Sequence, residues 1–283
     1  LAKKIGGEII NADSMQVYKN LNILTARPTA EDYKEIPHHL YGYVEGAERY
    51  NVANWCDDIS DIIKNNKDNK IYSIIVGGSG MYIDKFINGL VNIPSIPESI
   101  KKESEKFILE KGMSQFIKEI KTIDSESLIN ISNSDINRLR RIWEVYNFTN
   151  IKLSDWLKNK NKNYLLNRKY KLLLFTPDRK EIYIKVNRRF VEMINNGGIE
   201  EVKKLNLLNL DKSLPIMRAH GVPEITSYLE KIVSLEDCIA KGQQVTRNYV
   251  KRQLTWWRST SLRIYDSFDK FPEEIDLNSL KFT

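Results

Sequence analysis

The stretch IINADSMQVY, residues 9–18, decides how the rest of the chain is interpreted. The apolar pair Ile9-Ile10 is typical of the end of a buried strand, and Asp13 follows where the strand gives way to a turn. In open α/β sheets, ligands bind just beyond the carboxyl ends of the strands. Asp13 is therefore either a base that points into a crevice or a cap for the next turn, and this stretch alone leaves both interpretations open.

A second strand is predicted where the apolar run IYSIIV, residues 71–76, meets the turn Gly77-Gly78-Ser79-Gly80. A continuous apolar run indicates a buried strand, and a helix is expected over residues 81–87 after the turn. Glycines let the backbone approach a ligand closely, and the start of a helix offers free amide donors. Because such turns are also common without a ligand, this one adds weight only beside other motifs.

Adjacent imidazoles stand at His38 and His39, in a segment that is expected to be a loop, residues 37–40. Two histidines side by side suggest a metal ion, but neighbouring residues rarely bind the same ion. The pair therefore indicates a structural or substrate-shaping role.

Helical spacing predicts helices over residues 51–64 and 181–194 and a last long helix over 238–263. Residues 98–166 have a helical pattern, are rich in Asn and Lys and contain no convincing strand, which indicates a helical insertion. The apolar run at residues 172–175 then returns the chain to the sheet.

The last helix carries a basic stripe, because Arg247, Lys251 and Arg258 fall within about 40° of one another on a helical wheel. Contacts of Lys and Arg to phosphates give affinity for nucleic acid without reading its sequence. The roughly opposite side of the helix, which is expected to pack inward, carries Tyr249, Gln253 and Trp256.

The chain of 283 residues has a net charge of +7, which favours a polyanionic partner, and nucleic acid is the leading class. Its two cysteines, Cys56 and Cys238, are far apart and indicate neither a disulfide framework nor a metal cluster. This cysteine usage makes a reducing cytoplasm the expected location. No apolar run is long enough to span a bilayer.

Several motifs follow one another in a specific order along nearly the whole chain. They are Asp13-Ser14 with Gln16 and Tyr18, Thr25-Ala26-Arg27-Pro28, Pro37-His38-His39, Val76-Gly77-Gly78-Ser79-Gly80-Met81-Tyr82, Asp135 with Arg138, Arg141 and Glu144, and Thr246-Arg247 with Lys251-Arg252-Gln253, Thr255-Trp256 and Arg258. In this order they resemble the tRNA dimethylallyltransferases, the family that prenylates adenosine 37 of tRNA beside the anticodon.

The resemblance implies an α/β fold like that of P-loop kinases, a parallel sheet flanked by helices, with an all-helical insertion domain. Residues 1–94 and 171–283 would form the catalytic core with its basic C-terminal helices, and residues 95–170 the insertion. The implied reaction moves a dimethylallyl group from its diphosphate to the exocyclic amine of the adenine. Asp13 matches the family's base, Ser79 stands where the family usually has Thr near the reacting amine, and Arg189 matches an arginine that holds the diphosphate.

The resemblance further implies a monomer that binds the anticodon stem-loop of tRNA and dimethylallyl diphosphate, with Mg²⁺ as cofactor and no other bound metal. The residues that match positions in contact with tRNA are Asp13, Ser14, Met15, Gln16, Lys101, Asn137, Arg138, Leu139, Arg140, Arg141, Arg218, Ala219, His220, Gly221, Val222 and Pro223. The basic stripe of Arg247, Lys251 and Arg258 is expected to add phosphate contacts.

The chain departs from the family's pattern at its start. The family opens with a strand and a glycine-rich phosphate loop that ends in Gly-Lys-Ser/Thr, whereas residues 1–7 correspond to the end of the helix after that loop. Two alternatives therefore stay open: a non-catalytic RNA-binding remnant, and an enzyme that prenylates free adenine nucleotides. The helical insertion and the basic stripe argue against the second, because a small nucleotide needs neither.

Overall fold

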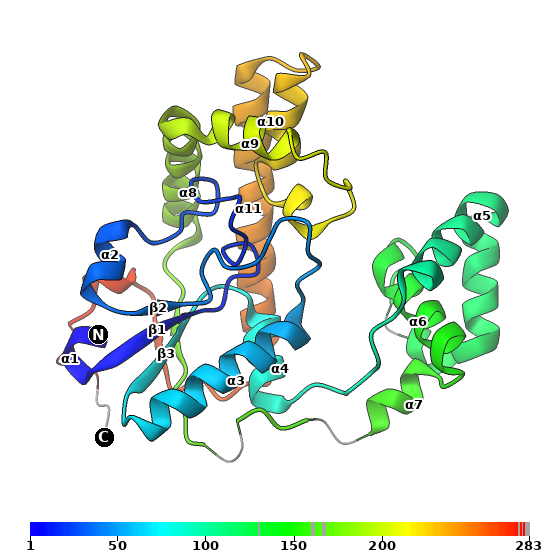
Figure 1. The fold of residues 1–283 in the computed structure, drawn as a ribbon, viewed down its shortest axis with the longest axis horizontal. Coiled ribbons are helices and arrows are strands. Elements are labelled where there is room, and N and C mark those ends of the chain that lie inside the picture. Colours follow the sequence, from blue (N-terminus) through cyan, green and yellow to red (C-terminus); the bar gives the residue numbers. More distant parts are fainter. Residues whose placement is uncertain (130, 160–161, 166–167, 277, 279, 281–283) are drawn as a thin grey trace. The chain divides into compact units, whose positions relative to one another are not determined.

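The computed structural model describes residues 1–283 apart from 130, 160–161, 166–167, 277, 279 and 281–283 (Figure 1). The chain divides into two compact units. The first combines Leu1–Ile87 with Tyr164–Thr283, and the second is Asn88–Asn163. The insertion proposed from the sequence, residues 95–170, begins and ends a few residues after the second unit.

The first unit contains a parallel three-stranded sheet in which β1, Gly7–Asn11, lies between β2, His38–His39, and β3, Tyr72–Val76. The α/β class with a parallel sheet is confirmed. The expected loop at residues 37–40 is wrong at its centre, because His38 pairs with Ile9 in β2. That pairing depends on the partner strand, since two residues have no local pattern that predicts a strand.

Strand β3 is less buried than its apolar sequence predicts. Tyr72 and Val76 are 57% and 48% exposed, and Ile74 and Ile75 are half-buried. In the part of the chain that the structure describes, no strand pairs with the second edge of β3.

Helices precede, connect and follow these three strands (Figure 1). The predicted helix over residues 51–64 is confirmed as α3, where Asn51 caps the first turn by accepting the N–H groups of Ala53 and Asn54. Trp55 and Ile59 are fully buried on its inner side. The helices of this part are α1, Ala2–Ile5; α2, Ala30–Glu35; α3, Val52–Asp68; and α4, Gly80–Asn88.

A second, two-stranded parallel sheet pairs β4, Leu173–Phe175, with β5, Asp266–Phe268. The strand predicted at residues 172–175 is thus confirmed, but it pairs with β5 and not with the first sheet. The rings of Phe175 and Phe268 stack across this strand pair, with 5.2 Å between their centroids. The sequence does not predict β5, because three residues between polar segments give no periodic signal.

The helices after β4 and the segment of residues 17–44 together build the main core of the first unit. Gly242 of α11 lets α8 come close, because a Cβ atom there would lie 2.1 Å from the ring of Phe190. Helix α11 begins three residues earlier than predicted, because Ser234 caps it by accepting the N–H of Asp237. The elements are α8, Arg179–Met193; a π turn, Ile194–Gly198; α9, Ile199–Asn206; a 3₁₀ turn, Pro215–Arg218; α10, Val222–Leu229; α11, Leu235–Ser259; and a 3₁₀ turn, Pro272–Glu274.

The second unit contains helices α5, Glu98–Leu128, α6, Ile136–Thr149, and α7, Leu153–Lys158. Phe116, Ile120, Leu139, Ile142 and Trp143 form its buried core. Across the described residues of both units, no helix has the length and apolar character that a bilayer crossing requires.

Candidate active site

Asp13 lies directly after β1 and is held by the backbone that follows it. Its Oδ1 accepts hydrogen bonds from the N–H groups of Met15 at 2.7 Å and Gln16 at 3.2 Å. Its Oδ2 accepts no hydrogen bond from the residues that the structure describes, and Asp13 lines a pocket. One oxygen therefore fixes the carboxylate while the other is left for a ligand.

The backbone before Asp13 is fixed by Asn11, the fully buried last residue of β1. The Asn11 side-chain amide donates to the carbonyls of Asp13 and Leu40, both at 2.9 Å, and its Oδ1 accepts the Asp13 N–H at 2.7 Å. The indole of Trp55 donates to the Asn11 carbonyl at 2.7 Å. This turn is rigid because every polar group of the Asn11 side chain has a partner in the protein.

The glycine turn after β3 lies against the turn that carries Asp13. The Ser79 N–H donates to the Ala12 carbonyl at 3.2 Å, and the Ser79 Oγ accepts the Ser14 N–H at 3.3 Å. A Cβ atom at Gly77 would lie 2.4 Å from the Ala12 backbone, so this approach needs a glycine. The two sequence-predicted catalytic residues, Asp13 and Ser79, are therefore brought together by neighbouring strand ends.

The inward side of α11 covers the same glycine turn, as its position opposite the basic stripe predicts. The Gln253 side-chain amide donates to the Gly78 carbonyl at 3.0 Å. A Cβ atom at Gly78 would lie 2.1 Å from the Gln253 amide nitrogen, and one at Gly80 would lie 2.2 Å from the Trp256 ring. Glycine is needed at Gly80, where the Trp256 ring leaves no room for a side chain, whereas a side chain at Gly78 would displace the flexible end of Gln253.

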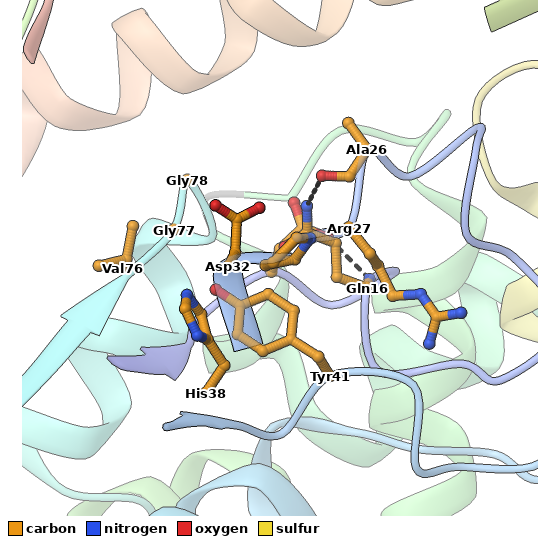
Figure 2. A pocket seen from close by; sticks show the side chains of 11 residues that line it. Gln16, Ala26, Arg27, Asp32, His38, Tyr41, Val76, Gly77 and Gly78 are labelled. Carbon is orange, nitrogen blue, oxygen red and sulfur yellow. Dashed lines mark hydrogen bonds between the residues drawn. The ribbon is translucent and has the colours of Figure 1, made fainter. Parts of the chain in front are cut away.

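A pocket of about 540 Å³ opens at these strand ends. Figure 2 shows His38 and Tyr41 close together at its wall, and their rings are 5.8 Å apart. Arg27 also lines the pocket, but its guanidinium donates to the Asn22 side chain at 3.1 Å. The lining residues are Asp13, Gln16, Ala26, Arg27, Pro28, Asp32, His38, Tyr41, Val76, Gly77 and Gly78.

Two of the wall residues, Asp32 and Tyr41, were not expected from the sequence as site residues. Tyr41 follows β2 by two positions, so its place depends on the pairing of β2 with β1. Burial raises its pKa to about 12, with smaller contributions from Tyr33 and Asp13. The two histidines have separate partners: His38 Nδ1 is 2.8 Å from the Ile36 carbonyl, and His39 Nε2 is 2.7 Å from Glu8 Oε2.

The model of the family described as IPP transferase matches residues 16–260 of this chain. The chain belongs to the IPP transferase family. Two curated relatives of this family member, both named tRNA dimethylallyltransferase, come from Ehrlichia chaffeensis and Wolbachia pipientis wMel. They are 36% and 39% identical over 278 and 262 residues, which cover 97% and 92% of this chain and 90% and 86% of theirs.

Solved structures agree with the family assignment. The tRNA isopentenylpyrophosphate transferase of Bacillus halodurans is 28% identical, with a TM-score of 0.64 over 98% of this chain and 86% of its own. The tRNA delta(2)-isopentenylpyrophosphate transferase of Staphylococcus epidermidis is 26% identical, with a TM-score of 0.65 over 98% and 88%. A eukaryotic dimethylallyltransferase acting on tRNA, at 24% identity and a TM-score of 0.74 over 90% and 64%, supports the fold alone.

Arg189 of this IPP transferase family member is available to an anion. Its side chain, on α8, is exposed and donates no hydrogen bond to a described residue. Desolvation lowers the pKa of its guanidinium, and the charge of Asp13 opposes that change. The structure thus puts the cation predicted to hold the diphosphate within electrostatic reach of the proposed base.

The members of the basic stripe on α11 differ in their surroundings. Arg247 donates to the Asn187 side chain and to the Gln244 side chain, each at 2.7 Å. Lys251 and Arg258 are exposed and make no ion pair with a described residue. Two cations of the stripe are therefore free to meet phosphates, while Arg247 also ties α11 to α8.

The segment predicted to contact tRNA at residues 218–223 is partly structural. Arg218 and Pro223 are exposed, whereas the side chains of Ala219 and Val222 are buried in the main core. Gly221 has φ of +96° and is the N-cap of α10. His220 meets the ring of Tyr249 edge-on, and burial together with Arg252 lowers its pKa, which favours a neutral imidazole.

In the second unit, the predicted tRNA-contacting segment also divides into surface and interior. Asn137 and Arg138 are exposed, but the Leu139 side chain is fully buried. Arg140 is engaged internally: its guanidinium donates to Ser104, Glu105 and the Lys101 carbonyl and pairs with Glu144. Arg141 is half-buried, and burial lowers its pKa, while Lys101 pairs with Glu98 at 3.2 Å.

Proposed function

We propose that this protein transfers a dimethylallyl group from dimethylallyl diphosphate to the exocyclic amine of adenosine 37 in tRNA. The proposal is carried by one observation: in a chain of the IPP transferase family, Asp13 presents a carboxylate oxygen without a hydrogen-bond partner among the described residues to a pocket at the ends of β1 and β3. Relatives with 35–39% identity are named tRNA dimethylallyltransferases, which supports the same reaction here.

In the proposed step, the amine nitrogen of adenine forms a bond to the allylic carbon. The bond between that carbon and the diphosphate oxygen breaks, and its electron pair leaves with the diphosphate. Asp13 Oδ2 takes one proton of the amine. Because the amine lone pair is delocalised into the ring, removing this proton as the new bond forms lowers the barrier, by about 100-fold or more.

The exocyclic amine has two N–H groups, which fits two acceptors that lie next to each other. Asp13 is proposed to accept one, and the Ser79 hydroxyl, which is joined to the same turn through Ser14, the other. This pair of contacts would orient the nitrogen toward the allylic carbon.

The leaving diphosphate is proposed to be met by Arg189, whose guanidinium is not engaged elsewhere in the described structure. We also propose Mg²⁺ as the counter-ion of the diphosphate. The described residues contain no group of three His, Cys, Asp or Glu side chains placed to hold a metal ion. This fits an ion bound mainly through phosphate oxygens, with Asp13 and Asp32 as the nearby carboxylates of the pocket.

The RNA partner is supported by the net charge of +7 and by the exposed cations Arg218, Lys251 and Arg258. Adenosine 37 lies in the anticodon loop, where a base is unstacked at lower cost than in a duplex. We place the protein with its substrate in the cytoplasm, which agrees with two cysteines that are both free.

The test is a prenyl-transfer assay with the full chain, dimethylallyl diphosphate, Mg²⁺ and an anticodon stem-loop RNA. Nuclease digestion and mass spectrometry should place one dimethylallyl group on adenosine 37. An RNA with guanosine at that position is the matched control and should stay unmodified, and AMP should be a poor acceptor. Absence of product on the stem-loop, or faster transfer to AMP, would overturn the proposal.

A further inference from the structure

Glu201, on α9, holds a distant segment of the chain through its carboxylate. Its Oε1 accepts the backbone N–H groups of Asn22 at 2.6 Å and Ile23 at 2.9 Å, and its Oε2 accepts that of Leu24 at 2.9 Å. Hydrogen bonds to an ionised carboxylate are roughly twice as strong as those between neutral groups. Because Glu201 is also half-buried, it is a firm attachment point for residues 22–24.

Residues 22–27 form a tight turn whose first N–H groups need an acceptor outside the turn. The Ala26 N–H donates to the Ile23 carbonyl at 3.0 Å, and the Arg27 N–H donates to the Asn22 carbonyl at 3.1 Å. Such a turn, like the first turn of a helix, leaves the N–H groups at its start without a partner of its own. The carboxylate from α9 accepts those N–H groups and thus caps the turn.

The other end of the turn is joined to the candidate site through Gln16. The Gln16 side-chain amide donates to the carbonyls of Thr25 at 2.7 Å and Ala26 at 3.1 Å, and Figure 2 shows the second of these bonds. Because both partners are acceptors, the amide nitrogen faces the turn and the amide oxygen, Oε1, is turned away from it. In the part of the chain that the structure describes, no group donates to that oxygen, and Gln16 lines the pocket. The turn therefore sets the direction in which Gln16 presents an acceptor.

The turn contains a strained residue next to its contacts with Gln16. Ala26 has φ of +51°, in the left-handed region that residues with a Cβ atom rarely adopt. Such a conformation persists only where the surrounding structure maintains it. The shape of the turn therefore depends on the contacts at its two ends, from Glu201 and from Gln16.

We propose that Glu201 is a positioning residue for the RNA substrate: it caps the turn of residues 22–27, and the capped turn aims the Gln16 oxygen at an N–H group of the RNA. The inference rests on the proposed function and deepens it. A diphosphate presents oxygen atoms, which are acceptors, so Gln16 Oε1 has nothing to accept from it. The base edges of RNA carry the N–H donors that this oxygen suits. Glu201 should therefore act on the affinity for RNA and not on the affinity for the diphosphate.

The proposed base is held independently of Glu201. Asp13 Oδ1 accepts the N–H of Met15 at 2.7 Å, and the Asp13 N–H donates to the Asn11 side chain at 2.7 Å. Neither contact passes through residues 22–27. Loss of the cap should thus leave the chemical step at saturating RNA nearly unchanged.

The experiment uses the full chain with Glu201→Gln, Gln16→Ala and the two combined. Glu201→Gln keeps the shape of the side chain but places an NH₂ group, a donor, against backbone N–H groups. Glu200→Gln is the matched control, because Glu200 is an exposed neighbour on α9 that pairs with Lys203 at 3.7 Å. Kd for the stem-loop RNA, KM for dimethylallyl diphosphate and the single-turnover rate at saturating RNA are measured. Hydrogen exchange follows the amides of residues 22–24.

Glu201→Gln should raise Kd for the RNA about fivefold, the effect of one hydrogen bond, and leave the diphosphate KM and the saturated rate within about twofold. The double variant should bind RNA no more weakly than Gln16→Ala, because Glu201 acts through Gln16. Amide exchange at residues 22–24 should become faster in Glu201→Gln, and Glu200→Gln should match the wild type throughout. A merely structural role would not separate RNA affinity from diphosphate affinity in this way.

A wild-type Kd for Glu201→Gln, losses of RNA affinity that multiply in the double variant, or unchanged amide exchange would overturn the inference. If Glu201→Gln does not fold, Gln16→Ala decides: a wild-type Kd for RNA overturns the inference, and a raised Kd with an unchanged diphosphate KM supports it. If the wild-type chain modifies no RNA, the proposed function fails instead. The exchange rates then still support or refute the cap that Glu201 gives to the turn.

Discussion

Replacing Asp13 by Asn and by Ala separates its two tasks. The Asp13 Oδ1 accepts two backbone N–H groups, from Met15 and Gln16. Asn has an oxygen that can accept the same two hydrogen bonds but is not a base, whereas Ala has neither. Asn and Asp are about equally good at this kind of turn cap.

The expected magnitudes differ between stability and rate. Asp13→Ala should cost about 1 kcal/mol of unfolding free energy, the usual loss of a capping side chain, and Asp13→Asn close to none. In a chain of this size, that corresponds to a decrease of about 2–4 °C in Tm for Ala. Both variants should lower the rate of prenyl transfer by at least about 100-fold, because both lose the base.

The measurements are single-turnover prenyl transfer to the stem-loop RNA, RNA binding and thermal unfolding. RNA binding should change little in either variant. Asp68→Ala, at an exposed position at the end of α3, is the control and should match the wild type in all three. A near-normal rate for Asp13→Asn would remove Asp13 from the mechanism, and equal destabilisation by Asn and Ala would refute the capping contacts.

Three further predictions concern cations. Lys251→Ala should weaken RNA binding and reduce the slope of log affinity against log salt concentration by about one unit. Lys241→Ala, on the same helix, is the control and should change neither. An unchanged slope for Lys251→Ala would mean that Lys251 contacts no phosphate. Arg189→Ala should raise KM for the diphosphate about tenfold, and a KM at the wild-type value would exclude the contact. Arg140→Ala should destabilise the protein by about 3 kcal/mol in urea unfolding, because it removes the ion pair of the buried Glu144, which keeps its hydrogen bond from Ser104; a loss of affinity for RNA without a loss of stability would contradict the internal contacts.

Local sequence predicts the elements whose signals are local. The strand, glycine turn and helix around residues 71–87 follow from one apolar run and four small residues, and the Asn51 cap follows from a side chain next to its helix. Strands β2 and β5 could not be predicted in this way. They have two and three residues, and each exists because a distant partner strand offers its edge.

The same distinction applies to the candidate site. The turns that carry Asp13 and Ser79 could be predicted because each comes after an apolar run, whereas the catalytic roles of the two residues were expected from the resemblance to the family. Tyr41 and Asp32 could not, because the register of β2 on β1 brings them to the pocket. Charge patterns indicated the class of partner, a nucleic acid, but not which cations lie at the surface. Arg138 is exposed, whereas Arg140, two residues further on, is engaged internally.

The two interpretations of Asp13, cap and base, exclude each other only if a carboxylate is treated as one acceptor. It has two oxygens, and the structure gives them different surroundings. Oδ1 accepts the hydrogen bonds of a cap, and these contacts fix the direction of Oδ2. A base must be held in one orientation to take a proton in a transition state, and at Asp13 the cap supplies that orientation. The capping contacts therefore support the proposed catalytic role and are not an alternative to it.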